Sequence, residues 1–186
     1  MISGLTNGER LMTAEELLRA DIPNKSTELV RGRLIVREPP STRHGRIQST
    51  LNFLVAGFVR AHQAGAVFGQ DTGFRIASDP DTVLAPDLAF VKRDRLALIP
   101  PRGYAALAPD LVAEIASPGD RPGEVLAKVA QWLDAGVEIA WLIDPERQSA
   151  QVYRSDGSVA AVPPHGALEG DSVLPGLSFP LAELFE

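Results

Sequence analysis

The chain has 186 residues, 45% of them hydrophobic and 23% charged, which is typical of a globular protein able to bury one sizeable core. It has no cysteine, and this excludes disulfides, thiolate metal sites and thiol nucleophiles. No apolar run could span a bilayer, and residues 1–16 lack a leader-like pattern. We therefore expect a cytoplasmic protein with no membrane partner, and the length favours one domain over residues 1–186.

The charge is unevenly distributed along the chain. The formal net charge of -6 argues mildly against a protein that coats nucleic acid. Residues 24–60 nevertheless carry seven basic side chains against two acidic ones, whereas residues 134–186 carry two against nine. The N-terminal part could face a polyanion; the alternative is that these are ordinary solvated charges.

The first part of the chain predicts a short helix, a hairpin and a long helix. A capping-box pattern starts at Thr13, so a helix should follow it directly. Residues 27–30 and 33–37 look like two strands joined by a turn at Arg31 and Gly32. A long amphipathic helix begins near Ser41 or Thr42 and ends at Gly65.

The middle of the chain predicts strands, one of which is interrupted. Residues 66–70 and 73–76 are strand-like, and residues 82–91 form an apolar strand broken by Pro86 and Asp87. A proline at that point is typical of an edge or a bulge, where a strand bends and re-aims a side chain.

A strand, a helix and a second strand follow between residues 110 and 143. The first strand has apolar residues on both faces and contains Glu114, the helix ends at Gly136, and the last strand spans residues 137–143. This succession is typical of a right-handed crossover. Three more elements are expected to lie peripherally, over one face: strands at 149–154 and 158–162, and a short helix near 181–185. The fold class is α/β, with a mixed, twisted β-sheet flanked by helices and an N-terminal hairpin and helix.

Two acidic residues lie in segments that the pattern would bury. Glu114 is in the two-faced strand and Asp87 is in the interrupted one. An unpaired buried carboxylate destabilises a protein by on the order of several kcal/mol. Each of these two carboxylates should therefore be protonated, paired with a cation or bound to a metal. Mg²⁺ or Mn²⁺ would suit carboxylate oxygens. Lys128 lies at the rim of the apolar stripe of its helix, from where its ammonium could approach such a site.

These residues carry a resemblance to a known family. The Pro86-Asp87 pair and a strand glutamate at Glu114 resemble the PD-(D/E)XK nuclease superfamily. An ordered set of short motifs resembles the Uma-type family of restriction endonucleases more closely, from about Thr13 to the C-terminus. The set comprises residues 28–34, 44–45, 85–89 and 114–121, Lys128, and residues 136–138 and 141–145.

The resemblance implies metal-dependent hydrolysis of DNA phosphodiester bonds within one PD-(D/E)XK nuclease-like domain. The implied metal ligands are Asp87, Glu114 and Ile115, with Mg²⁺ or Mn²⁺ as the cofactor. Lys128 would orient water or stabilise developing charge. Glu28 would be a third acid. His44 would be a neutral group beside the scissile phosphate, because a helix N-terminus disfavours imidazolium.

One residue departs from the superfamily pattern. The usual lysine lies two residues after the second acid, where this chain has Ala116, whereas the Uma-type family supplies its lysine from the next helix. The implied partner is DNA, and cleavage of both strands would favour a homodimer. A catalytically inactive nuclease fold that binds nucleic acid or protein is the alternative function.

Each assignment also has a structural alternative. The two buried acids could pair with buried arginines. Lys128 could form a surface ion pair with Glu124, four residues before it. Glu28 could be a charge on the face of the hairpin, and His44 could merely begin a helix. Asp144 is interpreted as a turn former at the end of a strand.

Overall fold

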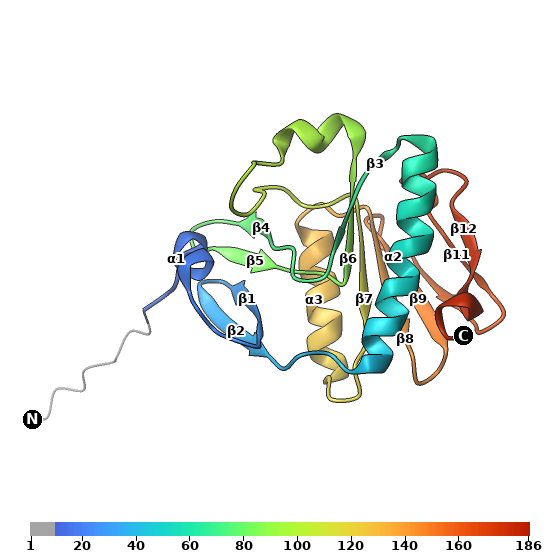
Figure 1. Ribbon diagram of the computed structural model, residues 1–186, viewed down its shortest axis with the longest axis horizontal. Helices are drawn as coiled ribbons and strands as arrows, with labels where there is room; N and C mark the ends of the chain where they lie inside the picture. Colours follow the sequence, from blue (N-terminus) through green and yellow to red (C-terminus); the bar gives the residue numbers. More distant parts are fainter. Residues whose placement is uncertain (1–9) are drawn as a thin grey trace, which may run out of the picture.

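The computed structural model describes residues 10–186, shown in Figure 1. Residues 1–9, on which part of the expectation about a leader rests, lie outside this range. The described α-helices are α1 (Ala14–Arg19), α2 (Thr42–His62) and α3 (Pro122–Asp134). Two short 3-10 helices, η1 (Arg93–Leu98) and η2 (Leu181–Leu184), follow β6 and β12 respectively.

A smaller, four-stranded antiparallel sheet contains the N-terminal hairpin. Its order is β2-β1-β5-β4, formed by β1 (Ser26–Val30), β2 (Arg33–Arg37), β4 (Phe74–Ala77) and β5 (Thr82–Leu84). Arg31 and Gly32 both have positive φ at the predicted turn, as a two-residue hairpin that follows strand twist requires.

The larger sheet has six strands in the order β10-β9-β8-β7-β6-β3. Its strands are β3 (Gly65–Gly69), β6 (Leu88–Lys92), β7 (Leu111–Ile115), β8 (Ile139–Asp144), β9 (Ser149–Arg154) and β10 (Val159–Val162). Strands β7 and β8 are parallel and α3 connects them, while the other neighbours in this sheet are antiparallel. The predicted crossover is therefore present.

Each face of the larger sheet has its own hydrophobic core. On one face, Leu111, Ala113 and Ile115 of β7 pack in a cluster with α2, η2 and the small sheet of β11 (Ala167–Glu169) and β12 (Ser178–Pro180). On the other face, Val112 packs in a cluster with residues of α3, β4 and β5. Figure 1 shows α2 and α3 on opposite sides of this sheet. The alternation along β7 directs Glu114 towards the α3 side.

The structure differs from the sequence expectations in three places. Residues 82–91 form two strands rather than one, because the chain leaves the smaller sheet after β5 and enters the larger one at β6. Strands β9 and β10 extend the larger sheet instead of covering its face, because β9 pairs with β8 along its length. The β11–β12 pair was not predicted, since each of these strands is only three residues long.

The α/β fold class, the mixed twisted sheet, the flanking helices and the N-terminal helix and hairpin agree with the prediction. Among the described residues, no helix combines the length and the hydropathy needed to cross a membrane.

Candidate active site

A cavity of about 490 Å³ opens between the two sheets and the first turns of α2. The five side chains singled out in the sequence line it together: Glu28, His44, Asp87, Glu114 and Lys128. Ile115 also lines it. These residues come from β1, α2, the segment before β6, β7 and α3, so five distant parts of the chain converge on one cavity.

Asp87 and Glu114 are brought together by the pairing of β6 with β7. Leu88 lies opposite Ala113 in this antiparallel pair, and the Asp87 N–H donates to the Ala113 carbonyl at 3.1 Å. Asp87 Oδ2 accepts the Ile115 N–H at 2.7 Å, so the carboxylate is held against the end of β7. The break in the strand at Pro86 is what turns Asp87 towards its neighbour.

Lys128 reaches the acidic side chains from α3. Its Nζ lies 2.9 Å from Glu28 Oε1 and 3.0 Å from Glu114 Oε2, and it donates to the Ala85 carbonyl at 2.9 Å. The Lys128 side chain is only 14% exposed. The alternative interpretation, a surface ion pair between Lys128 and Glu124, is therefore wrong. Glu124 instead pairs with an exposed arginine of the loop before it.

Glu114 is buried and has a partner on each oxygen. Oε2 faces Lys128, and Oε1 accepts the indole N–H of Trp132 at 2.8 Å. Trp132 lies four residues after Lys128, so both side chains project from the same face of α3. Pairing of Glu114 with a buried arginine is excluded by these contacts. Asp87, likewise, contacts a histidine and a backbone N–H instead of a guanidinium.

The charges within the cluster do not balance. Burial raises the pKa of Glu114 to about 7; the Lys128 ammonium opposes this shift, while the carboxylates of Asp87 and Glu28 reinforce it. Burial lowers the pKa of Lys128, but the Glu114 and Glu28 carboxylates outweigh it and hold that pKa above its ordinary value. Two cations, the Lys128 ammonium and the Arg37 guanidinium, face three carboxylates, so the cluster favours a further cation or proton.

His44 joins the cluster from the first turn of α2. Ser41 caps this helix by accepting the His44 N–H at 3.2 Å, which places the imidazole at the cavity. The ring bridges Asp87 Oδ1, 3.0 Å from Nε2, and Ser117 Oγ, 3.2 Å from Nδ1. Burial lowers the pKa of His44, but the hydrogen bond and the charge of Asp87, together with the nearby carboxylates of Asp120 and Glu114, outweigh it and the net shift is upward. Asp87 thus opposes the helix dipole on which the expectation of a neutral imidazole rested.

Glu28 is more than a charge on the face of the hairpin. It is buried in β1, and Oε1 accepts the Ala85 N–H at 2.9 Å in addition to the contact with Lys128. Arg37 of β2 lies 3.4 Å from Oε2 and 4.0 Å from an oxygen of Asp120. The hairpin is thereby joined to the loop that follows β7.

Sequence reasoning did not assign three residues that contact the cluster. The apolar pattern predicts Trp132 only as a core residue, Ser117 belongs only to a motif, and nothing in the sequence analysis concerns Gln48. Gln48 donates to the Asp87 carbonyl at 3.2 Å. Its position four residues after His44 on one helix face is the signal that could have found it. Asp144, in contrast, accepts two backbone N–H groups in the following turn, as expected.

The donor set of the cluster fits a hard divalent cation. Each carboxylate oxygen of Asp87 and Glu114 accepts one hydrogen bond or ion pair and keeps a lone pair, and oxygen ligands are those that Mg²⁺ and Mn²⁺ prefer. Within residues 10–186, however, no group of three or more His, Asp or Glu side chains is arranged so that it could hold a metal ion by itself. Mg²⁺ needs only one or two protein carboxylates when substrate phosphate completes its coordination.

The fold and the carboxylate–lysine cluster define an α/β protein of restriction-endonuclease type. A crystal structure of a putative nuclease belonging to DUF820 from Anabaena variabilis ATCC 29413 has this fold. It is similar with a TM-score of 0.79 and 24% sequence identity, over 94% of this chain and 97% of that one.

The family model Uma2, described as "Putative restriction endonuclease", matches residues 14–182. The chain belongs to this family, as the sequence motifs predicted. Among curated proteins, none matches the chain significantly.

Proposed function

We propose that the protein is a metal-dependent endonuclease that hydrolyses DNA phosphodiester bonds at the cavity described above. The observation that carries this proposal is the convergence of Asp87, Glu114 and Lys128 from three separate elements on one cavity. Family membership supports the same chemistry. The proposal includes Mg²⁺ or Mn²⁺ as the cofactor, DNA as the substrate and one catalytic domain.

Asp87 and Glu114 are proposed to hold the cation, with the backbone carbonyl of Ile115 as a third oxygen ligand. Ile115 offers only its backbone, and its N–H already holds Asp87 in place. Such a cation polarises the phosphoryl group and lowers the pKa of an attacking water when bound. Burial of both acids keeps bulk water from competing for them.

Lys128 is proposed to orient the attacking water and to stabilise negative charge on the phosphoryl oxygens. Its pKa lies above the ordinary lysine value, so it acts as a fixed positive charge and not as a base. Glu28 positions the ammonium from the opposite side at 2.9 Å. His44 Nε2 contacts Asp87 Oδ1, the oxygen that does not accept the Ile115 N–H, and thereby fixes the orientation of the carboxylate. Arg37, at the cavity edge, is placed to contact the DNA backbone.

The test is a nicking assay on supercoiled, linear and single-stranded DNA with Mg²⁺ or Mn²⁺. We expect wild-type protein to cut and Asp87→Asn and Glu114→Gln each to lose activity by about a hundredfold or more, since the reaction needs both ligands. Matched controls are Asp94→Asn and Glu138→Gln, which change exposed or half-exposed acids away from the cavity. If wild-type protein leaves every DNA form uncut, the endonuclease proposal fails.

One observation favours a second candidate, a catalytically inactive nuclease fold that binds nucleic acid. Lys128 bridges Glu28 and Glu114, and Arg37 also pairs with Glu28, so two cations compensate these two buried acids without a metal. A binding module would keep its DNA affinity when Asp87→Asn and Glu114→Gln are introduced. Fluorescence anisotropy with a labelled oligonucleotide measures this directly, beside the nicking assay.

A further inference from the structure

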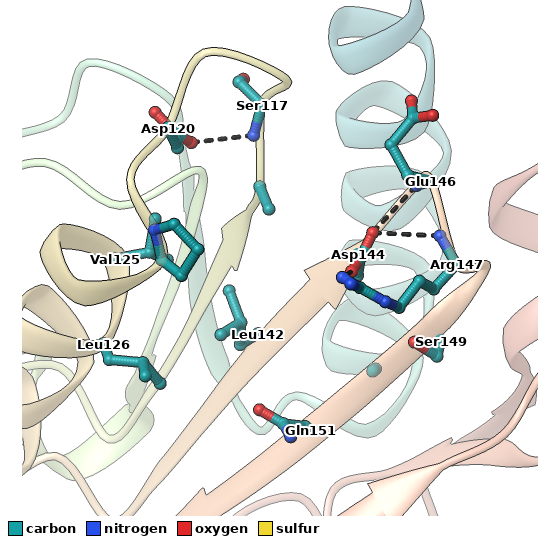
Figure 2. Close-up of a pocket in the computed structure, with 13 residues that line it drawn as sticks. Ser117, Asp120, Val125, Leu126, Leu142, Asp144, Glu146, Arg147, Ser149 and Gln151 are labelled. Carbon is teal, nitrogen blue, oxygen red and sulfur yellow. Dashed lines mark hydrogen bonds and ion pairs between the residues drawn. The ribbon is translucent and has the colours of Figure 1, made fainter.

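A second pocket of about 400 Å³ lies next to the candidate active site, between the loop after β7 and the turn after β8. Figure 2 shows Ser117, Asp120 and Val125 on one side of it, and the turn that contains Asp144 on the other. Its volume is in the range of sites that hold a small organic group.

The pocket shares a wall with the catalytic cavity. Ser117, Asp120 and Val125 line both hollows. Ser117 Oγ contacts the imidazole of His44, whose other nitrogen contacts Asp87. A phosphodiester held at the carboxylate cluster would therefore have its neighbouring nucleoside next to the opening of the second pocket.

The charge of the lining disfavours a phosphate in this pocket. Three carboxylates, those of Asp120, Asp144 and Glu146, line it against one guanidinium, that of Arg147. All three acids have partners: Asp144 accepts from Arg147 and from the turn backbone, Asp120 accepts the Ser117 N–H at 2.8 Å, and Glu146 pairs with Arg43. The guanidinium groups next to the pocket are thus already held by carboxylates and are not free to bind an anion, so a neutral group is the favoured occupant.

The walls suit a flat, partly polar ring. Leu126 and Leu142 line the pocket as apolar surfaces together with Val125. Gln151 of β9 lines the pocket from its exposed side, at the lower edge of Figure 2, and its Oε1 accepts the Tyr153 hydroxyl. Its amide N–H groups have no acceptor among the described residues and are free to meet an occupant. Glutamine amides pair with acceptor atoms on base edges, and apolar side chains pack on base faces.

We propose that this pocket receives one unpaired nucleobase adjacent to the scissile phosphate, so that the preferred substrate is DNA with unpaired bases at the cleavage point. This inference rests on the proposed endonuclease function and adds a substrate class to it. A base inside a duplex must leave its stack to enter the pocket, and this unstacking costs on the order of a few kcal/mol, which base-flipping enzymes supply. The cost is lowest for a base in a single strand.

The test compares cleavage rates of wild-type protein on single-stranded oligonucleotides in which one base at a time is replaced by an abasic site. We expect kcat/KM to fall about tenfold at one position flanking the cut and to stay unchanged at distant positions. A mismatched duplex should be cut faster than a matched one of the same sequence. Equal rates on every abasic oligonucleotide would overturn the inference while cleavage itself upheld the endonuclease.

A filling substitution provides the second arm. Leu126 is 44% exposed, so Leu126→Trp can fill the pocket without disturbing the core. Val159, which is 56% exposed on β10 and lines neither hollow, provides the matched control Val159→Trp. We expect Leu126→Trp to lower kcat/KM on the intact strand about tenfold and to leave the abasic strand unaffected. Equal losses on both strands would contradict the pocket's role, and absence of all cleavage by wild type would remove both proposals.

Discussion

Replacement of Lys128 by methionine tests the charge balance of the site without any assay of activity. Lys128 Nζ makes two ion pairs, at 2.9 and 3.0 Å, and donates to a carbonyl, and its side chain is 14% exposed. Lys128→Met keeps the aliphatic stem but leaves the carboxylates of Glu28 and Glu114 facing each other in a buried cavity. Removal of one partner of a buried pair costs about 3–5 kcal/mol, a large part of a typical domain stability of about 5–15 kcal/mol.

The measurement is urea unfolding in EDTA at pH 9, above the raised pKa of Glu114, followed by the fluorescence of the two buried tryptophans. The matched control is Lys25→Met, because Lys25 pairs with the exposed Glu38 at the surface, where such a pair is worth about 0–1 kcal/mol. Addition of Glu114→Gln to Lys128→Met should recover about 1–3 kcal/mol, since it removes the carboxylate left without a cationic partner, whereas Glu28 keeps Arg37. A cost for Lys128→Met below about 1 kcal/mol, equal to that of the control, would refute the buried cluster.

Three further predictions follow from single contacts. Trp132→Phe should cost about 1–3 kcal/mol more in urea unfolding than Trp141→Phe, because Trp132 donates to a buried carboxylate whereas the Trp141 indole has no partner among the described residues; equal costs would contradict the hydrogen bond. Gly65→Ala should prevent folding, as its Cβ would lie 2.0 Å from a carbonyl oxygen, while Gly45→Ala, with open space, should stabilise α2 by about 0.5–1 kcal/mol; circular dichroism melts distinguish them. Burial opposes the shift, but the Arg147 partner and the hydrogen bonds of the turn lower the pKa of Asp144 below its ordinary value of 3.8. The stabilisation from this carboxylate is therefore present above pH 3.8 and is lost as the pH falls further, so the Tm deficit of Asp144→Asn should disappear in acid. A Tm deficit that does not change with pH would contradict this.

Local patterns predicted most of the elements because they depend on periodicity and turn chemistry. The apolar residues on both sides of Glu114 indicated a strand buried on both faces, and β7 is fully buried. Arg31 and Gly32 indicated a two-residue turn, which the positive φ values require. These features are encoded within a few neighbouring residues, so no tertiary information was needed.

The partner of Lys128, in contrast, was decided by packing. Spacing along α3 allowed an ion pair with Glu124, worth a few tenths of a kcal/mol, roughly, in an isolated helix. Once α3 lies against β7, the same side chain is buried beside Glu114 and Glu28, and the uncompensated charge of these acids outweighs the surface pair. Lys128 lies fourteen residues after Glu114 and about half the chain after Glu28, and the spacing of residues along a helix carries no information about such contacts.

The identity of the acids and the elements that carry them was determined by sequence alone, because burial follows from the apolar pattern around Asp87 and Glu114. Tertiary structure decided that these acids meet, that His44 links one of them to Ser117, and that residues 82–91 divide between two sheets. The physical reason is that side-chain contacts between distant elements depend on how the sheets and helices pack, whereas secondary structure depends mainly on neighbouring residues.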